Sequence, residues 1–149
     1  MRVLKSLGAT VCALIAIAVF TTATPAQGQE PQYLRALSEL RTAREYIQFD
    51  RGQFNDERHR AVDEIGKAID EIKHAAWDDG KNTQFAPPDQ GVTTAWAPIH
   101  QSIHWLAEAK GHLSAGADLP QNAGLRERAI FHVSEALRIT NHLRDAGAK

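Results

Sequence analysis

Histidine is the residue type with the clearest chemical potential in this sequence. The chain of 149 residues contains seven histidines, and imidazole is the commonest metal-ligating side chain. His100 and His104 are four residues apart, which places two imidazoles on one face of a helix. One interpretation is a surface site for a divalent transition metal. The interpretation that we favour is an ordinary polar helix face, with His100 at the edge of an apolar row.

A second histidine pattern has the spacing of a di-metal bundle, but its residues do not face the expected core. Glu71 and His74 have the Glu-x-x-His spacing found in di-metal helical bundles. The apolar row of that stretch places Glu71 at an outward or flanking position and His74 near the opposite face; its residues are Val62, Ile65, Ile69 and Ile72. We therefore expect no buried di-metal centre. Covalent haem is excluded because no Cys-x-x-Cys-His occurs, and no inward histidine pair favours bis-histidine haem.

Four arginines form another candidate site. They open two expected helices in equivalent places and are Arg58, Arg60, Arg126 and Arg128. A guanidinium presents a planar fork to carboxylate or phosphate, so the group predicts contact with an anion or an acidic partner. The favoured alternative is a salt-bridged surface. The balance of 17 basic and 18 acidic residues argues against a nucleic-acid binder that works by bulk positive charge.

Tryptophan marks the long connection in the middle of the chain. Trp77 and Trp96 bracket it, and Trp105 falls near the outward face beside His104. An exposed tryptophan can mark a surface for a partner. The favoured alternative is that these side chains hold the connection against the helices.

The sequence contains no motif that is typical of nucleophilic catalysis. The serines that fall in expected helices lack an elbow motif or a phosphate-binding loop. The chain has a single cysteine, Cys12, so it cannot form an intrachain disulfide. Cys12 also lies in a segment that we expect to be removed. We therefore expect a protein that is not an enzyme.

Residues 1–28 have the organisation of a cleavable signal peptide. Arg2 and Lys5 precede an apolar run over residues 11–20, and small residues follow. The run is about ten residues long, short of the roughly 20 needed to span a bilayer. We expect export to the bacterial periplasm or beyond, and a mature domain of residues 29–149 without a membrane span; a retained anchor is the alternative. Loss of Arg2 and Lys5 takes the formal net charge from −1 to −3, and Met1 and Cys12 are lost as well.

Apolar residues recur at steps of three and four in four stretches. The row of the first stretch is Tyr33, Leu37, Leu40, Ala43 and Ile47, and that of the third is Ile99, Ile103, Leu106, Ala109 and Leu113. The expected helices cover about 31–48, 56–77, 97–115 and 122–146, and no stretch alternates with the period of a strand. Asn55 or Asp56 is the expected N-terminal cap of the second helix, and Gly80 and Gly147 are the expected C-terminal caps of the second and fourth. Short connections favour antiparallel neighbours. The predicted fold is an all-α antiparallel four-helix bundle made of hairpin one (about 31–77), a linker (about 78–96) and hairpin two (about 97–146).

The two predicted hairpins have similar sequences. Arg58, Ala61 and Ala68 recur 68 positions later as arginine and alanines, and Leu40 and Ala43 recur 66 positions later. This pattern indicates an internal duplication of a helical hairpin. Two hairpins that each expose one apolar face bury it best against each other.

Residues 37–79 resemble a family of small exported bacterial helical-hairpin proteins of unknown function. The resemblance rests on Arg-His-Arg-Ala at 58–61 and Ala-Ile-Asp-Glu-Ile at 68–72. It covers the second hairpin more loosely, where Phe131, His132 and Ile139 replace Asp63, Glu64 and Glu71. It implies an exported helical fold and no particular activity.

The sequence as a whole predicts a non-catalytic binding or interaction module with an unknown protein or small ligand as its partner. The alternative is a carrier of a small ligand or a transition metal that uses His100 and His104. A third hypothesis, a chaperone-like bundle, is weakened by the acidic charge and by the absence of methionine from the mature chain, because flexible methionine surfaces suit promiscuous binding.

Overall fold

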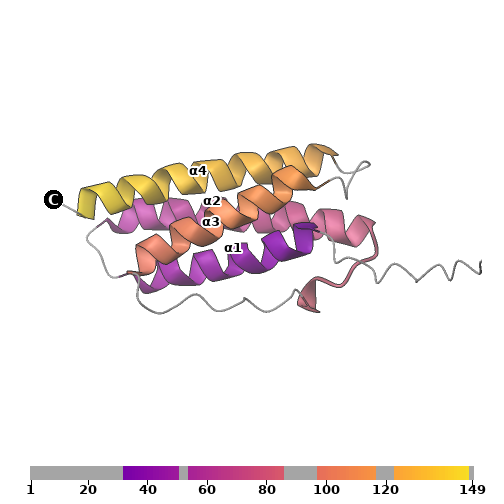
Figure 1. Ribbon diagram of the computed structural model, residues 1–149, viewed down its shortest axis with the longest axis horizontal. Coiled ribbons are helices and arrows are strands. Elements are labelled where there is room, and N and C mark those ends of the chain that lie inside the picture. The colour runs from indigo at the N-terminus through magenta and orange to yellow at the C-terminus, as the bar shows by residue number, and fades with distance from the viewer. Residues whose placement is uncertain (1–31, 51–53, 86–96, 117–122, 148–149) are drawn as a thin grey trace, which may run out of the picture.

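Four long helices make up the computed structural model, which describes residues 32–50, 54–85, 97–116 and 123–147. The helices are α1 (Gln32–Phe49), α2 (Asn55–Asp78), α3 (Pro98–Ala115) and α4 (Ala123–Gly147), with a short 3-10 turn, η1 (Thr83–Phe85), after α2. They lie side by side (Figure 1), and no strand occurs in the described ranges. The predicted signal peptide, Trp96 and most of the predicted linker lie outside the described residues. No helix among the described residues combines the length and the apolar character needed to cross a membrane.

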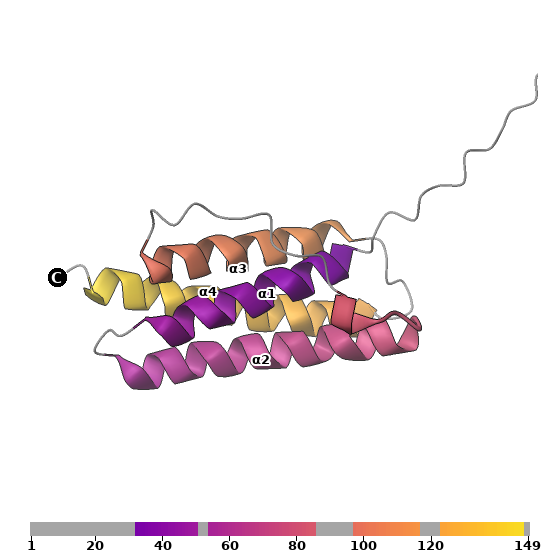
Figure 2. The ribbon, with the colours of Figure 1, turned by 90° about the horizontal axis from the view of Figure 1, so that it is seen from below.

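The largest helix–helix contacts join the first half of the chain to the second. α1 packs mainly against α3 and α2 mainly against α4, whereas the contacts of α1 with α2 and of α3 with α4 are smaller. In Figure 2, α1 lies between α3 and α2. We call the two large contacts the α1–α3 seam and the α2–α4 seam. In the α1–α3 seam, Glu39 meets His112, while Ala43, one turn later in α1, meets the earlier residue Ser102. The order of contacts is likewise reversed in the α2–α4 seam, where Glu64 meets His132 and Glu71 meets Arg128.

The apolar rows expected for the first and second helices are largely buried. Every apolar position of the expected row in α1 is buried, and so are Ile65, Ile69 and Ile72 of α2, whereas Val62 is half-buried. Many of the fully buried positions are alanines. They are Ala36, Ala43, Ala61, Ala68, Ala76, Ala109, Ala129 and Ala136. The side chains that fill the space between the helices include Leu37, Leu40, Ile47, Leu106 and Leu113.

The buried face of α3 differs from the one expected. Trp105 was expected near the outward face, but it is only 7% exposed. Gln101 and Ser102 are also buried, whereas Ile99 and Ile103 are half-buried. Because α3 packs against both α1 and α4, its buried face is broader than the single apolar row drawn through the isoleucines.

The ends of α2 confirm one predicted cap and correct another. Phe54, not Asn55 or Asp56, is the N-terminal cap residue and makes no side-chain capping hydrogen bond. Asp56 and Glu57 lie in the first turn instead, where negative charge interacts favourably with the helix dipole. At the other end Gly80 has a φ of +63°, and the backbone N–H groups of Gly80 and Lys81 donate to the carbonyls of Trp77 and Ala76. This is the Schellman arrangement that closes a helix with glycine. The predicted cap Gly147 is instead the last residue of α4.

Gly66 within α2 and Gly80 just after it should respond in opposite ways to alanine substitution. Gly80→Ala forces a Cβ into the left-handed region and should destabilise the protein by roughly 1–2 kcal/mol. Gly66→Ala lies within the helix, and its new Cβ would meet no atom within 4 Å, so it should stabilise the protein by about 0.5–1 kcal/mol. Urea denaturation of the two variants beside the wild type measures both effects. Equal shifts of the same sign would contradict the assignment of Gly80 as a conformational cap.

Candidate functional site

The histidines singled out from the sequence lie on the outer part of α3. His100 is exposed, and His104 is half-buried with its ring edge against Trp105 at a centroid distance of 5.2 Å. Their spacing places them on one side of the helix, as expected. Within the described residues, however, the structure gathers metal-type ligands elsewhere, one and two turns further along α3.

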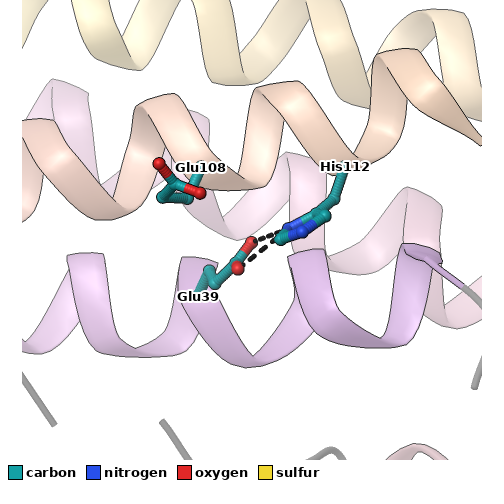
Figure 3. A group of neighbouring side chains, drawn as sticks. All are labelled: Glu39, Glu108 and His112. Carbon is teal, nitrogen blue, oxygen red and sulfur yellow. Dashed lines mark hydrogen bonds and ion pairs between the residues drawn. The ribbon is translucent and has the colours of Figure 1, made fainter. Parts of the chain in front are cut away.

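Glu39, Glu108 and His112 form the group of metal-type ligands, which we call the Glu–Glu–His cluster. One potential ligand atom from each residue lies within 4.8 Å of the other two. Glu39 comes from α1 and is 8% exposed, whereas Glu108 and His112 come from α3 and are exposed and half-buried. Figure 3 shows the imidazole of His112 reaching from α3 to the carboxylate of Glu39 on α1, with Glu108 one turn away on α3.

Two features of the fold position this cluster: the spacing of Glu108 and His112 along α3, and the burial of Glu39 on α1. Glu108 and His112 are four residues apart, so they share one side of α3 at the edge of the seam. Glu39 stands between the buried Leu37 and Leu40 of α1. A carboxylate at such a position needs a partner, because burial of an unpaired charge is costly. His112 supplies one, since its Nδ1 lies 2.9 Å from both carboxylate oxygens.

The donor set has a recognisable chemistry. One imidazole nitrogen and two carboxylates suit zinc and other first-row divalent ions, which accept mixed nitrogen and oxygen ligands. Calcium prefers six to eight oxygen ligands, so the imidazole argues against it. Three protein ligands would leave positions for water or an outside ligand, as in open zinc sites.

Sequence reasoning missed this cluster because its members come from different helices. Glu39 and His112 are 73 positions apart, and only the packing of α1 on α3 brings them together. A partial signal was present in the spacing of Glu108 and His112. A second was the acidic residue between buried leucines of α1.

The predicted arginine site is divided between the two ends of the α2–α4 seam. Arg58 donates to Asn55 in the first turn of α2, and Arg60 is exposed. In the first turns of α4, Arg126 donates to the carbonyl of Gly116, and Arg128 donates two hydrogen bonds of 2.8 and 2.9 Å to Glu71. Because Arg128 meets the later part of α2, the two arginine pairs do not converge.

The α2–α4 seam contains its own glutamate–histidine contact. Nδ1 of His132 lies 2.7 Å from Glu64, and Lys67 donates to the same carboxylate at 2.6 Å. Burial acts to raise the pKa of Glu64, but its hydrogen bonds with Lys67 and His132 outweigh that effect and hold the pKa below its ordinary value. The hydrogen bonds from Arg128 lower the pKa of Glu71 against the opposing effect of burial. Both carboxylates are therefore held in the charged form.

No protein-family model, curated protein or solved structure matches this chain. The resemblance of residues 37–79 to exported helical-hairpin proteins stays a prediction. What the protein does must be inferred from the side chains that the fold brings together.

The lowered pKa values of Glu64 and Glu71 predict a loss of stability in acid. A carboxyl whose pKa is lower in the folded chain adds stability above its unfolded pKa, near 4.5, and that stability is lost as the pH falls through the folded value. The Glu64→Gln/Glu71→Gln variant should be less stable than the wild type at pH 7, and the difference should shrink toward pH 3. Urea denaturation between pH 3 and 7 measures it. Asp63→Asn, at an exposed position of the same helix, is the matched control, and a difference independent of pH would contradict the assignment.

Proposed function

We propose that this protein is an exported, non-catalytic helical bundle that binds a divalent transition-metal ion at the Glu–Glu–His cluster. The finer fold that we propose is an antiparallel four-helix bundle of two similar hairpins. The reversed order of contacts in both seams supports it. So does the matched burial of positions related by the repeat, such as Leu40 with Leu106 and Ala61 with Ala129. Export is supported by the signal-like organisation of residues 1–28.

The observation that carries the metal proposal is the convergence of three ligand atoms from two helices within 4.8 Å. A pair of ligands on one helix is common on protein surfaces. A third ligand from a neighbouring helix, nearly buried and already oriented by a hydrogen bond to His112, is a more specific arrangement. Such orientation reduces the conformational entropy that metal binding would otherwise cost.

The charge of the cluster also favours a cation. The two carboxylates have oxygens no more than 4.8 Å apart, and at that upper limit two negative charges repel by about 1 kcal/mol in bulk water and by about 3.5 kcal/mol at an effective dielectric constant of about 20. One protonated histidine offsets only one of the two carboxylates. A divalent ion neutralises both and leaves His112 free to bind it as neutral imidazole.

A second candidate function is contact with a protein partner through exposed aromatic side chains. Trp77 on α2 and Phe131 on α4 are 83% and 65% exposed, and Phe49 at the end of α1 is 74% exposed. Large exposed aromatic side chains are enriched at protein interfaces. The exposed Trp77 and Phe131 lie on α2 and α4, whereas the ligands of the Glu–Glu–His cluster lie on α1 and α3, so the two functions would use side chains of different helices.

Removal of a ligand should weaken metal binding without unfolding the protein. Isothermal titration with Zn²⁺ should give one high-affinity site per chain in the wild type, weakened at least tenfold in Glu39→Gln and in His112→Ala. His74→Ala, at an exposed histidine of α2, is the matched control and should bind as the wild type does. Circular dichroism checks that the variants fold. Absence of binding to the wild type, or binding that both ligand variants retain, would overturn the proposal.

Metal should also raise the thermal stability of the folded protein. A ligand that binds only the folded state at 100 times its dissociation constant adds about 2.7 kcal/mol. We expect Zn²⁺ to raise the melting temperature of the wild type and of His74→Ala, and to raise that of Glu39→Gln by a clearly smaller amount. Mg²⁺ at the same concentration should have little effect, because it prefers octahedral oxygen coordination. An equal shift with both ions would point to nonspecific charge screening.

A further inference from the structure

Four potential metal ligands follow one another along α3 at intervals of four residues. They are His100, His104, Glu108 and His112. Only the last two belong to the Glu–Glu–His cluster. The first two are the histidines that the sequence singled out, and the cluster leaves them without a role.

Because of helix geometry, these four residues form a continuous row that winds around α3, so successive members face different surroundings. Four residues exceed one turn of 3.6, so each step rises about 6 Å and rotates about 40° around the helix. The row starts at the exposed His100, passes the half-buried His104 and the exposed Glu108, and ends at the half-buried His112, which meets Glu39 of α1. It therefore leads from the solvent face of α3 to its seam with α1.

The surface beside the row is made of small residues. Ala107, Gly111 and Ala115 are exposed, and a Cβ added to Gly111 would meet no atom within 4 Å. No bulky side chain at these three positions obstructs an ion with its remaining water ligands. Such an ion needs this space because it keeps part of its hydration shell while it exchanges protein ligands.

We propose that this row is a loading path with two stations. His100 and His104 form the outer station, since two imidazoles four residues apart on a helix are an established zinc-binding arrangement. The Glu–Glu–His cluster is the inner station. This inference rests on the proposed metal-binding function and adds how the ion reaches the site.

Transfer along the path is ligand exchange. The bond from the ion to an imidazole of the outer station breaks as a bond to the carboxylate of Glu108 forms, and His112 and Glu39 then replace the outer ligands. The ion keeps its oxidation state, and protons displaced from the ligands go to solvent. The inner station holds the ion more tightly because it has three ligands, two of them negatively charged, and one of these is nearly buried, where charges attract more strongly.

The test separates the rate of loading from the strength of binding. Zn²⁺ is mixed with the wild type, with His100→Ala/His104→Ala and with His74→Ala in a stopped-flow instrument, and a chromophoric zinc indicator follows the free ion. Titration calorimetry gives the affinity of each protein. We expect the double variant to keep the affinity of the inner station within twofold while its loading and release both slow at least threefold. His74→Ala should match the wild type in both.

Three other outcomes would overturn the path. Unchanged rates in the double variant would show that the ion enters the inner station directly. A fall in affinity as large as that of Glu39→Gln would make His100 or His104 a ligand of the inner station itself. A wild type that binds no Zn²⁺ would remove the metal-binding function together with the path, whereas the first two outcomes leave that function intact.

Discussion

Alanine fills fully buried positions on all four helices, including Ala43 on α1, Ala61 on α2, Ala109 on α3 and Ala136 on α4. Helix axes usually lie about 8–10 Å apart, and small contact residues favour the shorter distance. At a short distance, polar side chains at the edge of one helix can reach those of the next. The hydrogen bond from Ser102 to the carbonyl of Ala43 and the two glutamate–histidine contacts all depend on this proximity.

The two seams use the same contact in different electrostatic settings. Each joins a glutamate from the first half of the chain to a histidine from the second. In the α2–α4 seam the third group is Lys67, whose positive charge balances Glu64. In the α1–α3 seam the third group is Glu108, which adds negative charge instead. The charge of the third group therefore decides the character of each contact. Lys67 completes an ion-pair network, whereas Glu108 creates a cluster that attracts a cation.

The sequence predicted what depends on local periodicity and missed what depends on register between helices. The ends of all four helices fall within one or two residues of the expected positions, because apolar spacing and glycine placement are local signals. The position of Trp105 was wrong because a row drawn through Ile99 and Ile103 ignored the second helix that α3 packs against. The partnership of Glu39 with His112 could not be predicted, since a shift of one helix by a single turn would give each residue a different neighbour.

The contact between Glu64 and His132 bears on how such a chain could arise. The two residues are 68 positions apart, the same interval that relates Arg58 to Arg126 and Ala61 to Ala129. Under the proposed duplication they are the same position in the two hairpins, and their contact places them beside an approximate twofold axis. In a dimer of identical hairpins, a residue on that axis faces its own copy, so the pair would be two glutamates or two histidines, each repelling its twin when charged. If the chain arose by the proposed duplication, the complementary Glu64–His132 pair would have required the two halves to diverge, because a hairpin that pairs with an identical copy cannot form it.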